Sequence, residues 1–292
     1  MTRPRKKRKV LLIEPDYSNK FPPIGLMKIS TYYKNLGNWD VTFYKGNLRT
    51  LVLETITDKC VDMFAKIDPD TDWSIKKDKI FEYIKTRKST LIAETGIYNS
   101  EYAILLESKL MEYKDYWWKG EWKKHPEWDR VGVTTLFTFY WDKTIATIEF
   151  AKLLCKDWRH NLMVGGVLAS IQPKEIEKAT GIKPHVGILR PGDIDKGDKQ
   201  FIDNLPLDYS ILDEVDYQYS MSNAFYGYMS RGCIRHCAFC AVWTLEPDYV
   251  PYIPLTPRIS QTRDEFGDRR AVLLMGTSDR VGELFEGVTQ EI

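Results

Sequence analysis

The chain has 292 residues, of which 43% are hydrophobic, and its 42 basic and 41 acidic side chains give a formal charge of +1. This composition is typical of a packed globular protein with one large or two ordinary domains, and the near-zero charge provides no overall field toward nucleic acid or a membrane. No apolar run reaches the roughly 18 residues that span a bilayer. The basic residues 1–9 lack the apolar stretch of a signal peptide. We therefore expect a cytoplasmic protein with no membrane partner.

Apolar runs and helical patterns alternate at the start of the chain. The basic run at 3–9 leads directly into an apolar run at 10–13, so we interpret it as the solvated approach to a strand rather than as a nuclear import signal or an RNA contact. A helical pattern at 24–36 ends at Gly37, and a second strand follows at 41–44. The order strand, helix, strand predicts the start of a doubly wound parallel sheet.

Residues from about 50 to 130 interrupt this order with helical patterns and an aromatic, basic stretch at 116–128. Interleaved Trp and Lys side chains could stack on nucleobases, which makes RNA a weakly supported partner. The alternative, which we favour, is an insertion whose tryptophans cover a neighbouring surface. The α/β order then resumes, with strands predicted at 131–139, 162–164 and 185–189 and helices at 145–155 and 173–180.

The last third of the chain has a different organisation. A linker rich in turn formers and acidic residues is predicted at 201–222, so that residues 1–200 form one α/β domain with a helical insertion and residues 223–292 a second. Within the second domain we expect strands at 225–231 and 271–275. Helices are predicted at 258–266 and 281–292.

Three of the five cysteines, Cys233, Cys237 and Cys240, fall within eight residues with the spacing C-x3-C-x2-C. Thiolates hold iron–sulfur clusters, and three thiolates on a four-iron cluster leave one iron open to a small molecule. A structural zinc site would need four ligands, and His236 adjoins Cys237, which makes joint ligation awkward. An electron-transfer cluster would need a fourth cysteine nearby. Cys60 and Cys155 are isolated and are expected to be ordinary buried or half-buried thiols.

Two glycine-containing turns follow predicted strands of the N-terminal part, at residues 22–26 and 165–170. In parallel α/β sheets ligands bind beyond the carboxyl ends of the strands, and glycine lets the backbone approach a ligand closely. The same turns are also explained as tight connections from strand to helix.

The cysteine spacing, with the aromatic Phe239 before the last cysteine, resembles the cluster loop of radical S-adenosylmethionine (SAM) enzymes. The strand followed by Pro-Pro-x-Gly-Leu at 22–26 and the Gly-Gly-x-x-Ala-Ser at 165–170 resemble the cobalamin-binding-type domain that precedes many radical SAM barrels. The resemblance implies an α/β protein. Its N-terminal doubly wound parallel sheet would be of the Rossmann, cobalamin-binding-like type, followed by the first units of a partial (β/α) radical SAM barrel.

This resemblance also implies cofactors and roles. Cys233, Cys237 and Cys240 would ligate a 4Fe–4S cluster, whose open iron would bind SAM. Phe239 would contact the adenine side of SAM. Asp279 is the candidate for its amino group, although Gly276–Asp279 departs from the common Gly-Gly-Glu form. A flavodoxin-like or ferredoxin-like reductant would supply the electron that yields a 5′-deoxyadenosyl radical, and the substrate is unknown.

The chain departs from the family in two respects. The cobalt-ligating motif Asp-x-His-x-x-Gly is absent from the context of all four histidines, so cobalamin is expected only without a protein ligand. The 68 residues from Phe225 to Ile292 suffice for about two barrel units. We therefore expect a truncated, inactive product or a chain that needs a second polypeptide to complete the barrel. The rival function is a binding or scaffold protein stabilised by zinc or a cluster.

Overall fold

Apolar strands build a four-stranded parallel sheet in the computed structural model, which describes residues 6–235, 237–238, 240–251 and 253–275. The strand order is β2-β1-β3-β4, and every neighbouring pair is parallel. In register, Leu12 lies between Phe43 and Gly132, at the centre of the sheet. The strands are β1 (Arg8–Glu14), β2 (Trp39–Lys45), β3 (Arg130–Thr135) and β4 (Leu162–Gly166).

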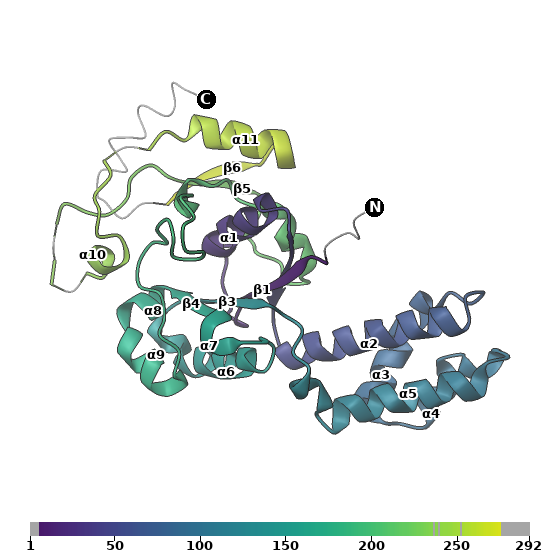
Figure 1. Cartoon of the computed structure of the whole chain (residues 1–292). Helices are drawn as coiled ribbons and strands as arrows, with labels where there is room; N and C mark the ends of the chain where they lie inside the picture. The colour runs from purple at the N-terminus through teal and green to yellow at the C-terminus, as the bar shows by residue number, and fades with distance from the viewer. Residues whose placement is uncertain (1–5, 236, 239, 252, 276–292) are drawn as a thin grey trace. The chain divides into compact units, whose positions relative to one another are not determined.

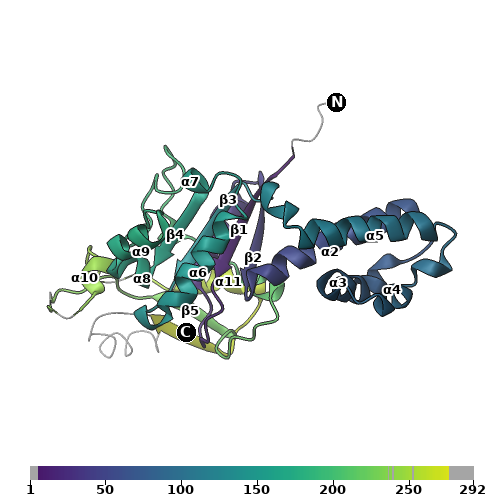
Figure 2. The ribbon, with the colours of Figure 1, turned by 90° about the horizontal axis from the view of Figure 1, so that it is seen from below.

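Helices cover both faces of this sheet. Helix α1 (Ile24–Asn35) lies on one face and α6 (Trp141–Lys152) on the other, as Figure 1 shows, and Figure 2 shows α6 in front of the strands. Each helix joins consecutive parallel strands, which is the doubly wound arrangement. Val10 and Leu12 alternate with Leu11 and Ile13 along β1, and all four are fully buried because the sheet is covered on both sides. The predicted α/β fold class is confirmed.

Shorter helices complete this part of the chain, and one predicted strand is wrong. Residues 185–189 form no strand, because Gly187 adopts a φ of +80° and its N–H turns to the Ser170 hydroxyl at 2.9 Å. The strand predicted to reach residue 139 ends at Thr135. The further elements are η4 (Thr138–Tyr140), α7 (Trp158–Asn161), α8 (Val167–Ile171), α9 (Pro173–Thr180), η5 (Ile202–Asn204) and η6 (Tyr209–Glu214).

Residues Asn47–Pro126 form a separate compact unit made of helices. The rings of Phe64 and Trp73 meet edge to face at 5.1 Å in its core. Trp117 and Trp122 are buried and stack at 6.0 Å, so their faces are covered by protein. The elements are α2 (Leu48–Ile67), η1 (Trp73–Lys76), α3 (Lys77–Thr86), α4 (Thr90–Glu94), η2 (Ile97–Asn99), α5 (Ala103–Trp118) and η3 (Glu121–Lys124).

A second, two-stranded parallel sheet carries the cysteine segment. Strand β5 (Ala224–Tyr228) pairs with β6 (Ala271–Met275), and α10 (Val242–Leu245) and α11 (Thr256–Phe266) lie between them in the chain. The predicted strand at 225–231 therefore ends earlier. This part groups with residues 1–46 and 127–200 in one compact unit, so the domain boundary at 201–222 stays a prediction. The predicted helix at 281–292 lies outside the described residues.

None of the helices in the described residues is both long enough and apolar enough to cross a membrane.

Gly166, at the end of β4, offers a test of how tightly strand and helix pack. Its φ is +105°, and a Cβ there would lie 2.9 Å from the Thr135 backbone nitrogen. We expect Gly166→Ala to lower the free energy of unfolding by about 2 kcal/mol or more, since both backbone strain and overlap oppose the side chain. Urea unfolding measures this.

Gly25→Ala is the matched control. A Cβ at Gly25 meets nothing within 4 Å, and the residue lies in the first turn of α1. This substitution should be neutral or stabilise the protein by up to about 1 kcal/mol. Equal losses for the two variants would contradict the packing argument.

Candidate active site

The cysteine loop leaves the carboxyl end of β5. Cys233 comes five residues after Tyr228, the last residue of the strand, and Cys237 and Cys240 follow before α10. All three cysteines are half-buried. Ligands in parallel α/β structures bind at this end of the strands. The loop therefore lies where this architecture places its chemistry.

A buried ion-pair network holds Arg231, the residue that precedes this loop. The guanidinium of Arg231 contacts two carboxylates. Two of its nitrogens donate to Asp203, with Nε 3.1 Å from Oδ2, and the third nitrogen donates to Glu246. All three side chains are about nine-tenths buried. The guanidinium also lies over the ring of Tyr228, at 3.2 Å from its centroid. Arg suits such a place because its planar fork bonds two carboxylates at once.

Lys28 of α1 brings a second cation to the same place. Its Nζ lies 2.6 Å from Asp203 Oδ1 and donates a bond of 2.7 Å to the Asp203 carbonyl. Two buried cations thus face two buried carboxylates, Asp203 and Glu246, so that no charge is left uncompensated. Removing one partner from such a network leaves a buried charge, which costs far more than a surface pair is worth. We refer to Lys28, Asp203, Arg231 and Glu246 as the charge cluster.

The same residues close the base of the loop. The Gly232 N–H donates to Glu246 Oε2 at 2.8 Å, and Arg231 and Val250 exchange two backbone hydrogen bonds of 3.0 and 2.8 Å. Gly232 has a φ of +67°, and a Cβ there would lie 2.7 Å from the Asp248 carbonyl oxygen. Residues 232–249 therefore form a closed loop whose two ends meet at a base of Arg231, Gly232, Glu246 and Val250.

Burial and charge act against each other within the charge cluster. Burial alone would raise the pKa of Asp203, but the adjacent Lys28 and Arg231 outweigh it and hold this pKa below its usual value. For Lys28 burial wins, and it lowers the pKa to about 8 although Asp203 opposes the shift. The carboxylate of Asp203 thus stays ionised at neutral pH, whereas the ammonium of Lys28 loses its proton more readily than an ordinary lysine does.

The three cysteines have thiol donors of the kind that an iron–sulfur cluster takes. The Cys240 N–H donates to the Cys237 carbonyl at 3.0 Å, and the Arg235 N–H points to Cys233 Sγ at 3.4 Å. Within the residues that the structure describes, no three His, Cys, Asp or Glu side chains are grouped so as to hold a metal ion. The donor set fits a cluster by its chemistry, and its ligation stays a prediction. Phe239, His236 and Asp279 lie outside the described residues.

The two remaining cysteines behave as expected. Cys60 and Cys155 are buried, and burial raises the pKa of both thiols. Neither is therefore suited to form a thiolate at neutral pH.

A cavity of about 350 Å³ opens beside the loop. The loop contributes Thr244 and Pro247, and Val250 lines the cavity from the base of the loop. Ile188 and Phe201 supply apolar walls from the preceding segment. Arg258 of α11 also lines the cavity and is bonded to Asn204 Oδ1 at 3.2 Å. A largely apolar hollow with a few cationic groups is the usual form of a small-molecule site.

The carboxyl edge of the four-stranded sheet is the second candidate region. The order β2-β1-β3-β4 changes direction between β1 and β3, and ligands bind at such switch points. An aromatic group follows these strands, in which Tyr17 stacks on Tyr140 at 4.5 Å and Phe137 on Phe139 at 5.5 Å. Phe139 is 74% exposed, whereas Tyr17 is fully buried and burial raises its pKa to about 12.

The comparisons with known proteins are sparse. No family model matches the chain, and no curated protein matches it. A solved structure that resembles it is TsrM, a radical SAM methyltransferase from Kitasatospora setae with a tryptophan substrate and a SAM analogue bound. The identity is 13% and the TM-score 0.46, over 98% of this chain and 51% of that one. The chain thus spans about half the length of that enzyme.

The structure places two of the histidines, His160 and His185, beside carboxylates. His160 is exposed and bonded to Asp157 at 2.8 Å. His185 lies beside the end of β4. Its backbone N–H donates to the Val164 carbonyl, and its ring Nε2 lies 3.8 Å from Asp193 Oδ2. Cobalamin stays a prediction.

The charge cluster is what the sequence did not indicate. Arg231 is recognisable only as the end of an apolar strand, and Lys28 only as a polar residue within a helix. A lysine beside the apolar face of α1 is the one available signal. Its carboxylate partner Asp203 lies 175 residues away, so no spacing rule could connect the two.

We expect Arg231→Gln to lower the free energy of unfolding by about 3 kcal/mol or more, because Asp203 and Glu246 would lose their shared cation while buried. Arg190→Gln is the control. Arg190 pairs with Asp248 at 2.8 Å on the surface and should cost less than about 1 kcal/mol. Chemical unfolding of both variants measures the difference, and similar small losses would contradict the role given to the cluster.

The lowered pKa of Asp203 predicts a pH dependence. Its unfolded pKa is about 3.9, so the unfolded state takes up the proton first as the pH falls. The stability that the carboxylate provides is therefore fully present above that pKa and is lost as the pH falls through the lower, folded value. The difference in unfolding free energy between wild type and Asp203→Asn should shrink as the pH falls below about 4.

Asp248→Asn, with its carboxylate on the surface, should show a difference near zero throughout. A gap between wild type and Asp203→Asn that persists unchanged into strong acid would contradict the assignment.

Proposed function

We propose that this chain is a radical SAM enzyme whose 4Fe–4S cluster is held by Cys233, Cys237 and Cys240. The observation that carries the proposal is a C-x3-C-x2-C loop that leaves the carboxyl end of a parallel strand and is closed at its base by buried charges. When bound, the cluster supplies the electron that cleaves SAM to a 5′-deoxyadenosyl radical. A reductant of the flavodoxin or ferredoxin class is the proposed source of that electron.

The residues of the chain have positioning roles in this proposal. Arg231 and Glu246 hold the two ends of the loop together, so that the segment with the three thiols is anchored at both ends. The apolar cavity lined by Ile188, Phe201 and Val250 would hold a small molecule away from bulk water next to the loop. Water exclusion matters because a reactive radical must meet its substrate before it meets solvent. Phe239 and Asp279 remain the proposed contacts for SAM.

The rival proposal, a scaffold protein stabilised by metal, rests on the same cysteines. Half-buried thiols close together in sequence also suit zinc, but zinc would need a fourth ligand. Metal content therefore separates the two proposals.

The test is anaerobic reconstitution of the protein with iron and sulfide, followed by dithionite and SAM, with 5′-deoxyadenosine measured by mass spectrometry. We expect product from the wild type and none from the Cys233→Ala, Cys237→Ala, Cys240→Ala triple variant. Cys155→Ala is the control and should retain product formation, since that thiol is buried outside the loop. A protein that takes up one zinc and no iron would overturn the proposal.

A further inference from the structure

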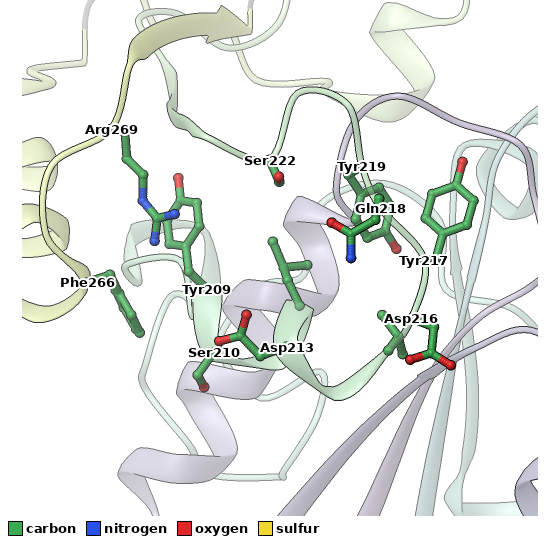
Figure 3. Close-up of a pocket in the computed structure, with 12 residues that line it drawn as sticks. Tyr209, Ser210, Asp213, Asp216, Tyr217, Gln218, Tyr219, Ser222, Phe266 and Arg269 are labelled. Atoms are coloured by element: carbon green, nitrogen blue, oxygen red, sulfur yellow. The ribbon is translucent and has the colours of Figure 1, made fainter.

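A second cavity lies at the opposite end of the small sheet from the cysteine loop. It measures about 550 Å³ and is lined by residues that precede the strands, Ser222 before β5 and Arg269 before β6, together with residues of η6 (Figure 3). The strands are parallel, so these residues share the amino edge of the sheet, whereas the cysteine loop leaves the carboxyl edge. The proposed chemistry at the cysteines makes no use of this cavity.

Arg269 is the cationic group of this cavity. Its Nε is buried and has no hydrogen-bond partner within the described part of the chain. The guanidinium lies over the ring of Tyr209 at 4.3 Å, and Tyr209 is itself held by a 2.8 Å bond from its hydroxyl to the Ala224 carbonyl. A buried donor without a partner is costly, and an anionic ligand is the natural acceptor for it. The stacked position means that little side-chain freedom is lost on binding.

Two carboxylates face the same cavity. Asp213 and Asp216 are exposed side chains, and neither forms an ion pair or hydrogen bond with any residue the structure describes. Figure 3 shows Arg269 reaching into the cavity above Asp213, while Asp216 lies on the other side. The cavity thus presents a fixed cation and separate, accessible anions to one ligand.

The remaining walls combine polar side chains, among them Ser210, Gln218 and Ser222, with aromatic and aliphatic ones. The rings of Tyr209 and Phe266 meet at 5.7 Å, and Leu212 and Val215 also line the cavity. The aromatic part of these walls suits an aromatic group of a ligand.

We propose that this cavity binds a free α-amino acid with an aromatic side chain. Its carboxylate would bond to Arg269, its ammonium to Asp213 or Asp216, and its ring would pack against Tyr209 and Phe266. A plain anion would leave the carboxylates unused and be repelled by them, whereas a zwitterion satisfies both signs of charge. The cavity is an accessory binding site, separate from the cysteine loop.

The test is a calorimetric titration of the full chain with L-phenylalanine. The arms are 3-phenylpropionate, which lacks the ammonium group, and phenethylamine, which lacks the carboxylate. We expect L-phenylalanine to bind and each arm to bind at least about tenfold more weakly, since each loses a charge-assisted hydrogen bond. Binding of 3-phenylpropionate as tight as that of L-phenylalanine, or no binding of L-phenylalanine at millimolar concentration, would overturn the proposal.

Two variants locate the site. Arg269→Gln should weaken binding of L-phenylalanine at least about tenfold. Arg270→Gln is the matched control, because Arg270 is exposed and bonds Asn223 only through its backbone N–H, and it should leave binding unchanged. Equal effects of the two variants would overturn the assignment, and thermal unfolding confirms that both are folded. The titration needs neither iron nor SAM, so its outcome is independent of the proposed enzymatic function.

Discussion

The buried contact between Arg231 and the carboxylates of Asp203 and Glu246 is the interaction on which the cysteine segment depends. Arg231 follows β5, Asp203 lies in η5 and Glu246 follows α10. Lys28 connects this contact to helix α1, which covers the larger sheet. Charges are expensive to bury, and they are tolerated here because each has a partner of opposite sign. Segments far apart in sequence are thereby fixed at one place.

The consequence is a loop with a fixed base and half-buried thiols. Gly232 begins the loop in a left-handed backbone conformation, and its N–H donates a hydrogen bond to Glu246. The geometry of the base is thus specified by backbone bonds and buried charge rather than by the cysteines themselves. An anchored loop of this kind would keep a ligand set in place without requiring the bound group to organise the whole fold.

Most of the larger sheet could be predicted from the sequence, because its strands are uninterrupted apolar runs and α1 has a clear helical period that ends near Gly37. The failures have local causes. The apolar run at 185–189 resembles a strand, but the positive φ of Gly187 turns the chain away. The candidate site was found through the cysteine spacing, together with the aromatic Phe239 before the last cysteine. The charge cluster and the Arg269 cavity could not be predicted, since both join residues whose proximity only tertiary packing creates.

The most direct measurement is Mössbauer spectroscopy of the protein reconstituted with ⁵⁷Fe and sulfide, before and after addition of SAM. The account predicts a four-iron cluster with one iron distinct from the other three, because only three thiolates are available, and a change in the signal of that iron alone when SAM is added. Four equivalent irons that do not respond to SAM, or a protein that binds no iron, would contradict it.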